Sequence, residues 1–167
     1  MNAARATIAA ILPNSDGWIE IGPTSIVLDS ADVTHALASL PDGSLAASEQ
    51  VRALCAEADA LGVSVLVLPE LISTLCRLVR EGRLSSEDYR SLKFAVQADL
   101  SDADLCDLSQ DAFEQTIRCL ENHPLRALDA LHVGSALVYQ ADLFISADRR
   151  QAKAAGREGL AVVDLSQ

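Results

Sequence analysis

This 167-residue sequence has few aromatic residues, few basic residues and no long apolar run. Phe, Trp and Tyr make up 4% of the chain, which leaves little material for platforms on which nucleic-acid bases could stack. There are 13 Lys and Arg residues against 24 Asp and Glu residues, so the formal net charge is -11. Broad electrostatic binding of nucleic acid or of an anionic membrane is therefore not expected, and a bound polyanion would have to be held locally.

The apolar runs are short and interrupted, and the start, MNAARATIAAIL, holds a single Arg and a brief hydrophobic stretch. This pattern predicts neither secretion nor membrane insertion, so we expect the protein in the cytoplasm. The four cysteines are scattered and form no C-x-x-C pair, which favours free thiols over disulfides or a zinc site. Half of the residues are hydrophobic, which is enough for one globular core.

Short apolar runs alternate with helical patterns along most of the chain. This alternation predicts an α/β fold with a small, mostly parallel five-stranded sheet flanked by helices. Four of the runs are almost continuously aliphatic, as in strands covered on both faces, whereas 103–108 alternates with acids and is typical of an edge strand. The expected strands cover residues 24–29, 63–68, 103–108, 142–146 and 160–165.

The segments between these runs carry helix start and stop signals. Glycine suits a helix exit, proline the first turn and serine the N-cap. The helix that Ser109 is expected to cap carries Phe113, Ile117 and Leu120 as its apolar residues. The expected helices cover residues 51–61 before Gly62, 69–81 before Gly82, a segment opening at Ser85, 110–122 before His123, 125–139 and 149–158.

Residues 1–23 do not share this alternation. ATIAAIL and WIEIG flank the turn sequence Pro-Asn-Ser-Asp-Gly, which indicates two short strands that form a hairpin or, alternatively, a flexible tail. The sequence thus divides into an N-terminal extension, residues 1–23, and one domain, residues 24–167. We expect no chemistry from the extension.

Acidic residues stand just past the ends of three expected strands. They are Asp29, Glu70 and Asp148. In open α/β sheets the ligand site lies outside the carboxyl ends of the strands. Each acid taken singly has a structural explanation as a helix cap or as a first-turn acid. Three carboxylates at one rim, however, repel one another unless a cation neutralises them.

Asp129 is a fourth acidic candidate, on the expected helix 125–139. Its neighbours one turn away are Leu125 and Val133, so its charge points along a largely apolar face. A carboxylate placed there is half-buried and needs a partner, either a ligand or a basic side chain elsewhere in the fold. Arg126 is poorly placed for this, because each residue of a helix is rotated by about 100° from the last.

Four segments around these acids resemble the PIN-domain ribonucleases of the VapC toxin type. The segments are SIVLDSADV, LVLPELISTLCRLVREGRLS, LRALDALHVGSAL and ADLFISADRRQAKAAGREGLAVVDL. The resemblance extends from about Thr24 to Leu165 and implies a PIN-like fold. It further implies a Mg²⁺- or Mn²⁺-dependent endoribonuclease, the toxin of a toxin-antitoxin pair, with RNA as substrate, a small antitoxin as partner and a homodimer as assembly.

The same resemblance assigns roles to individual residues. It implies that Asp29, Glu70, Asp129 and Asp148 bind the metal and carry the catalysis, with a metal-activated water attacking the phosphodiester. It also suggests that Ser146 orients one of the carboxylates or a metal-bound water. Mg²⁺ takes few carboxylates directly and keeps several waters, so some of the four acids are expected to act through water.

The chain departs from the family at its first motif. Ala31 stands where serine or asparagine is common, and Asp32 where a small apolar residue is usual. Asp32 is either a fifth acid near the metal or a solvated side chain in a first helical turn. Arg149 and Arg150 directly follow Asp148 and either hold RNA phosphates or belong to a solvated helix face.

The three histidines and the acidic balance of the chain allow two further interpretations. The histidines are expected to be structural or exposed, although His132, three residues after Asp129, could touch the side chains around the site. The second functional hypothesis is a catalytically weak or inactive PIN-like binding module that acts through a protein partner. The acidic composition and the altered first motif favour it.

Overall fold

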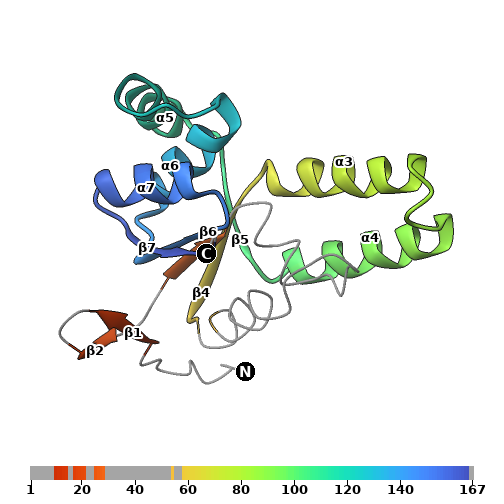
Figure 1. Cartoon of the computed structure of the whole chain (residues 1–167), viewed down its shortest axis with the longest axis horizontal. Coiled ribbons are helices and arrows are strands. Elements are labelled where there is room, and N and C mark those ends of the chain that lie inside the picture. The colour runs from red at the N-terminus through yellow and green to blue at the C-terminus, as the bar shows by residue number, and fades with distance from the viewer. Residues whose placement is uncertain (1–9, 15–16, 22–24, 29–53, 55–57, 166–167) are drawn as a thin grey trace.

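The computed structural model describes residues 10–14, 17–21, 25–28, 54 and 58–165. Five of its strands form one sheet in the order β5-β4-β3-β6-β7 (Figure 1). Every neighbouring pair is parallel, and β5 lies at an edge. The expected α/β fold with a parallel five-stranded sheet is therefore confirmed. The strands are β3 (Ser25–Leu28), β4 (Ala60–Ser64), β5 (Asp104–Cys106), β6 (Leu143–Ser146) and β7 (Ala161–Asp164).

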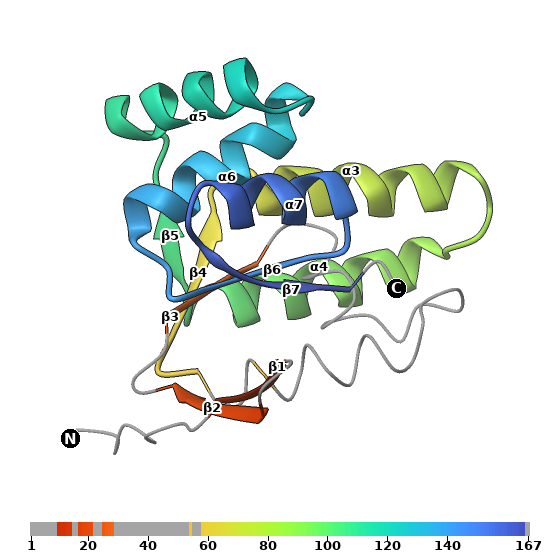
Figure 2. The ribbon, with the colours of Figure 1, turned by 60° about the vertical axis from the view of Figure 1, so that its left-hand side comes forward.

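Helices cover both faces of this sheet. They are α3 (Val67–Arg80), α4 (Ser86–Leu100), α5 (Gln110–Asn122), α6 (Ala127–Tyr139) and α7 (Arg149–Arg157). Figure 2 shows α6 and α7 along one side of the sheet with α5 stacked on α6, while α4 lies on the other side. Figure 1 shows α3 and α4 as a helical pair that extends away from the sheet.

The alternation of side chains along β6 divides the core between these two layers. Leu143 and Ile145 pack into a cluster with Val67 of α3 and Val96 of α4. Phe144, between them in sequence, points to the opposite face and packs with Val133 of α6 and other small residues. All three strand residues are fully buried, so β6 is a central strand with a covered face on each side.

The junction between β4 and α3 differs from the sequence-based expectation. Residues 60–61 lie in a strand, not in a helix, Gly62 lies inside that strand, and α3 begins at Val67, two residues before Pro69. The aliphatic run VSVLVL was expected to be one strand, but a short apolar run does not distinguish a strand from a helix. Val67, Leu71 and Leu75 are buried at four-residue spacing, and this helical period decides the boundary.

Other local signals are confirmed. The Asp88 backbone N donates to Ser85 Oγ at 3.0 Å, and the Ala112 backbone N donates to Ser109 Oγ at 3.2 Å, so both serines act as helix caps. The N-terminal hairpin also forms, with β1 (Ala10–Asn14) antiparallel to β2 (Gly17–Ile21). The division of the chain at residue 23 stays a prediction.

The cysteines follow the expectation of free thiols as far as the structure describes them. Cys76, Cys106 and Cys119 are free, while Cys55 lies outside the described residues. Burial raises the pKa of both Cys106 and Cys119 to about 11, which keeps these thiols protonated and unreactive. Of the helices described, none has the length and apolar character needed to cross a membrane.

Candidate active site

The sheet order places β3 between β4 and β6, with the three strands running in the same direction. Leu28, the last residue of β3, is level with Val63 of β4 and with Ile145 of β6. The chain therefore leaves these strands at one edge of the sheet, and two of the exits lead into the helices that carry Glu70 and Asp148. Asp29 lies outside the described residues, as do Ala31, Asp32 and His35.

Asp148 caps the N-terminus of α7. Its Oδ1 accepts hydrogen bonds from the backbone N of Arg150 at 2.7 Å and of Gln151 at 3.3 Å, and its Oδ2 lies 3.2 Å from a guanidinium nitrogen of Arg150. The structural explanation considered for this acid, an N-cap, is thus realised. About a third of the side chain, 36%, remains exposed, so a ligand can still reach it.

The charge of Asp148 is stabilised by these bonds. Burial raises the pKa of its carboxyl, but the hydrogen bonds from the Arg150 side chain and from the two backbone N–H groups outweigh burial, and the pKa lies below the usual value. The pKa of Arg150 is raised, first by its hydrogen bond to Asp148 and to a smaller extent by the charge of Asp129. Both carboxylates therefore act on the same guanidinium group.

Glu70 lies in the first turn of α3 and contacts a buried histidine. Its Oε2 is 2.8 Å from Nε2 of His132, whose side chain is 3% exposed, against 26% for Glu70. His132 belongs to α6, three residues after Asp129, so this contact joins the two helices that carry Glu70 and Asp129. The expectation that His132 could touch the side chains around the site is confirmed for Glu70.

Asp129 occupies the first turn of α6 and is half-buried. Its Oδ2 accepts from the backbone N of Arg126 at 3.4 Å. The rotation of about 100° per helical residue predicts that the Arg126 side chain is poorly placed to serve as a partner. The structure uses its main chain instead, as in a capping interaction at a helix start, where backbone N–H groups lack partners within the helix.

Ser146 and Gln151 connect the segments that carry Asp129 and Asp148. Ser146 Oγ accepts from the Asp148 backbone N at 3.0 Å and donates to Gln151 Oε1 at 2.6 Å. Gln151 Nε2 donates to the Asp129 carbonyl oxygen at 3.1 Å. Sequence reasoning missed Gln151. Its place three residues after an acidic N-cap would have suggested a capping box, which predicts a side chain turned back to its own helix.

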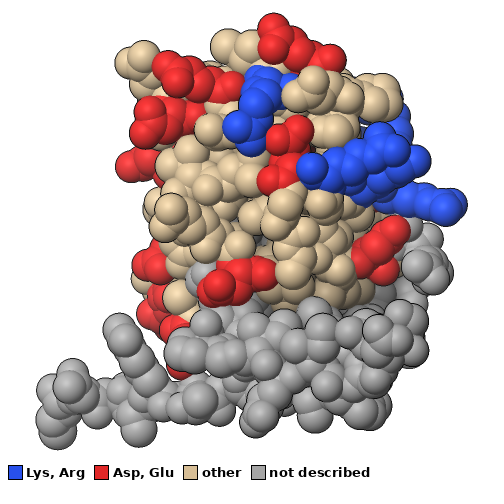
Figure 3. All heavy atoms as spheres, turned by 90° about the vertical axis from the view of Figure 1, so that its left-hand side faces the viewer, with Lys and Arg blue, Asp and Glu red and all other residues tan. Residues whose placement is uncertain are grey.

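Arg149 and Arg150 lie exposed at the start of α7. Their helix also carries exposed Lys153 and Arg157. On the face drawn in Figure 3, Lys and Arg side chains gather in two groups with acidic side chains between them. A local cluster of this kind is what the overall negative charge requires of any site for a polyanion.

The donor chemistry of these acids fits a hard divalent cation, which prefers carboxylate oxygens. The side chains of Glu70 and Asp148 are partly exposed, so their oxygen atoms are accessible. Among the side chains that the structure describes, no three of His, Cys, Asp or Glu gather closely enough to hold an ion. A cation at this edge would therefore be held by one or two of these carboxylates with water in its other positions, or by a set that includes Asp29.

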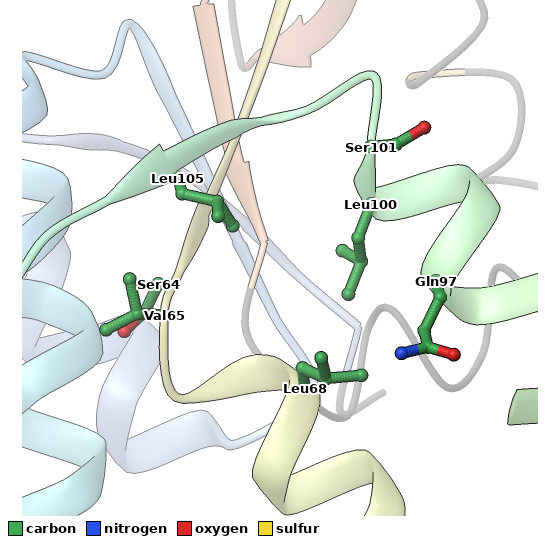
Figure 4. Close-up of a pocket in the computed structure, with 7 residues that line it drawn as sticks. All are labelled: Ser64, Val65, Leu68, Gln97, Leu100, Ser101 and Leu105. Atoms are coloured by element: carbon green, nitrogen blue, oxygen red, sulfur yellow. The ribbon is translucent and has the colours of Figure 1, made fainter.

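An apolar pocket of about 290 Å³ lies elsewhere, between β5 and the helices α3 and α4. Figure 4 shows Leu68, Leu100 and Leu105 around the same space, with Gln97 at its side. None of the candidate site residues lines it, and its walls hold no titratable side chain. It therefore contributes no acid-base or metal chemistry.

The fold is shared with solved toxin structures at low sequence identity. VapBC2 of Rickettsia felis, solved with a promoter DNA fragment, is 14% identical with a TM-score of 0.60, over 84% of this chain and 98% of that chain. FitAcB of Neisseria gonorrhoeae is 14% identical with a TM-score of 0.61, over 83% and 96%. VapC20 of Mycobacterium tuberculosis, described as a toxin that cleaves the sarcin-ricin loop, is 17% identical with a TM-score of 0.60, over 83% and 98%.

A search of the curated proteins finds no match. The sequence itself, however, matches the PIN domain over residues 26–157, which is well over half of its length. This range includes Asp29, Glu70, Asp129 and Asp148, and the parallel sheet with its acidic edge has the corresponding fold. The chain belongs to the PIN domain family.

Proposed function

We propose that this protein is a Mg²⁺- or Mn²⁺-dependent endoribonuclease, the toxin of a toxin-antitoxin pair. The observation that carries the proposal is the acidic edge of the sheet in a PIN fold, where β4 and β6 lead to Glu70 and Asp148 on either side of β3. Asp129, on α6, is related to both acids. Its charge acts on Arg150, the partner of Asp148, and it lies one turn before His132, the partner of Glu70.

The four acids Asp29, Glu70, Asp129 and Asp148 are proposed to hold the cation. A divalent ion held in this way would polarise the phosphodiester and lower the pKa of a bound water. The chain's own residues would keep the carboxylates in place. His132 holds Glu70, the α7 backbone holds Asp148, and Ser146 fixes the turn before α7.

Arg149 and Arg150 are proposed to hold phosphates on either side of the bond that is cut. They are exposed at the N-terminus of α7, where the helix dipole also favours anions. Phosphate contacts position RNA without reading its sequence, and the shortage of aromatic residues fits recognition by backbone and shape.

A small antitoxin is the proposed protein partner. The structural neighbours include toxin-antitoxin complexes from Rickettsia felis and Klebsiella pneumoniae. An antitoxin that covers the acidic edge would block RNA without any change in the fold. A homodimer, the assembly implied by the family, is the proposed oligomeric state.

The test is cleavage of structured RNA by the purified full chain, with Mg²⁺ or Mn²⁺ and then with excess chelator. We expect cleavage only with the metal. Asp129→Asn should slow cleavage at least about 100-fold, because a ligand is lost while an amide oxygen can still accept from the Arg126 backbone N. Asp111→Asn, at an exposed acid in the first turn of α5, is the matched control and should cleave normally.

Equal cleavage by the wild-type protein and Asp129→Asn, or cleavage that persists in chelator, would contradict the proposal. The activity would then come from a contaminating nuclease or from other residues.

A binding module without catalysis is the second candidate. It is favoured by the state of Asp148, which caps α7 and pairs with Arg150. Two measurements, Mn²⁺ binding and RNA cleavage, distinguish the two candidate functions. Mn²⁺ binding in calorimetry with no cleavage of any RNA pool would support the binding module, whereas binding with cleavage supports the nuclease.

A further inference from the structure

Gln151 is a polar residue in a place that otherwise holds small apolar ones. Its side chain is 1% exposed, and it is among the largest side chains that the fold buries completely. Its neighbours on the buried face of α7 are Ala152, Ala154 and Ala155. A buried amide without partners is costly, so a glutamine at this position needs hydrogen bonds at both ends.

Both ends of the Gln151 amide do have partners, and these come from two different elements. The oxygen accepts from Ser146 Oγ of β6 at 2.6 Å, and the nitrogen donates to the carbonyl oxygen of Asp129 on α6 at 3.1 Å. Ser146 Oγ in turn accepts from the Asp148 backbone N. The Gln151 backbone N completes the arrangement by donating to the Asp148 carboxylate at 3.3 Å.

One side chain therefore connects the turn that carries Asp148 with the turn that carries Asp129. These segments are distant in sequence, and within the described part of the chain the hydrogen bonds to each carboxylate come from its own helix start. We propose that Gln151 is a positioning residue, which fixes the spacing of Asp129 and Asp148 so that both can serve one divalent cation. This role rests on the proposed function, because it concerns the same metal site.

Positioning is the physical reason for using an amide here. An apolar side chain of equal size would fill the space but leave α6 and α7 free to slide by fractions of an ångström. Hydrogen-bonded partners that orient metal ligands commonly change metal affinity by about 10–100-fold when removed. Such an effect on affinity is expected even though Gln151 does not touch the cation.

The experiment measures Mn²⁺ binding to the full chain by isothermal titration calorimetry. Gln151→Met keeps the length of the side chain and removes both hydrogen bonds, and it should weaken Mn²⁺ binding about tenfold. Ser146→Ala removes the same link from its other end and should weaken binding similarly. Gln110→Met, on the exposed surface of α5, is the matched control and should bind as the wild-type protein does.

A purely structural role gives a different pattern. It would lower the urea midpoint of Gln151→Met while leaving the Mn²⁺ affinity of the folded protein unchanged. Two further variants separate the roles. The double variant should bind no more weakly than Ser146→Ala alone, because the link through Gln151 is already broken in that variant. Ser146→Thr, which keeps the hydroxyl, should retain most of the affinity.

Each result of these measurements supports or overturns the positioning role. If the wild-type protein and folded Gln151→Met bind Mn²⁺ with equal affinity, the positioning role is overturned and the nuclease proposal stays intact. No Mn²⁺ binding by the wild-type protein overturns the metal site itself and this role with it. If Gln151→Met does not fold, Ser146→Ala decides in its place, and wild-type affinity in that variant overturns the proposal.

Discussion

Helices α3 and α5 carry large apolar side chains at the same helical spacing, but they use them in opposite ways. On α3, the residues Val67, Leu71, Leu75 and Leu78 are buried. On α5, Phe113, Ile117 and Leu120 are 47%, 54% and 38% exposed. The buried face of α5 consists of Ala112, Thr116 and Cys119.

The difference comes from how closely each helix approaches its neighbour. Gly134 of α6 lies against α5, and a Cβ atom added there would sit 2.8 Å from the Ala112 carbonyl oxygen and 2.9 Å from the Thr116 backbone N. Small residues on both helices allow this contact, and large ones would prevent it. An apolar stripe therefore predicts a helix but does not determine which face of the helix is buried.

The largest effect is expected for a large-to-small change on α3. Leu75→Ala should lower the free energy of unfolding by about 3 kcal/mol, because Leu75 is 4% exposed and its removal leaves a cavity. Leu120→Ala makes the same change on the exposed stripe of α5 and should cost less than about 1 kcal/mol. Urea unfolding followed by circular dichroism measures both. Equal losses would mean that the α5 stripe is buried after all.

A small-to-large change should break the α5–α6 contact. Gly134→Ala is expected to cost about 2 kcal/mol, since the new methyl group meets backbone atoms that cannot easily move. Gly156→Ala, in α7, is the matched control, because the nearest atom to its added Cβ is Val162 Cγ2 at 3.7 Å. The control should be neutral or up to about 1 kcal/mol more stable, since alanine favours a helix over glycine. If the urea midpoints of Gly134→Ala and Gly156→Ala fall by the same amount, the close approach at Gly134 is contradicted.

Polar contacts also hold α5, and they should respond to pH. Glu158, at the end of α7, accepts from Arg118 at 2.8 and 3.1 Å and contacts His123 at 2.9 Å. The hydrogen bond with His123 is the largest cause of a lowered Glu158 pKa, with burial opposing it and Arg118 adding to it. Glu158→Gln should therefore cost about 1 kcal/mol near pH 7.

The sign of the pH dependence follows from that lowered pKa. The contribution of Glu158 is fully present above the ordinary carboxyl pKa of 4.5 and is lost as the pH falls through the lower pKa of the folded state. Unfolding free energies of wild-type protein and Glu158→Gln should therefore converge between pH 4.5 and more acidic values. A difference that stays constant throughout that acidic range would show that the charge of Glu158 contributes nothing.

The smallest effect on stability, but a visible one on assembly, is expected for Ile117→Glu. Ile117 is exposed on the apolar stripe of α5, so the free energy of unfolding of the monomer should change by less than about 0.5 kcal/mol. Exposed apolar stripes commonly serve as contacts with another protein. If the stripe is the homodimer contact, light scattering should show a dimer for the wild-type protein and a monomer for this variant. A dimeric Ile117→Glu protein would place the contact elsewhere.

Much of the fold was predictable from local patterns. The aliphatic runs predicted the strands β6 and β7, and the alternating acids predicted the edge strand β5. Ser85 and Ser109 predicted helix starts. All of these predictions are confirmed. The boundary between β4 and α3 was not predictable, because VSVLVL suits both elements. The boundary is set by the pairing of β4 with β3 and by the buried apolar stripe of α3.

The candidate site was likewise predictable in part. All four acids were proposed from their positions after expected strands or on an apolar helix face. Three of them, Glu70, Asp129 and Asp148, lie in the first turn or at the cap of their helices, and Asp29 lies outside the described residues. Their partners were less visible. The Arg126 main chain and the amide of Gln151 could not be assigned from spacing, because each contact depends on how neighbouring helices are set against the sheet.

The α/β alternation, the parallel sheet and the kinds of side chain at its acidic edge can be derived from the amino-acid order, because they follow from periodicity and local hydrogen bonding. The buried face of α5, the contact of His132 with Glu70 and the link of Gln151 between two distant turns emerge only in the folded molecule. Such contacts join residues far apart in the chain. Their geometry is set by the close packing of whole helices, which no local pattern encodes.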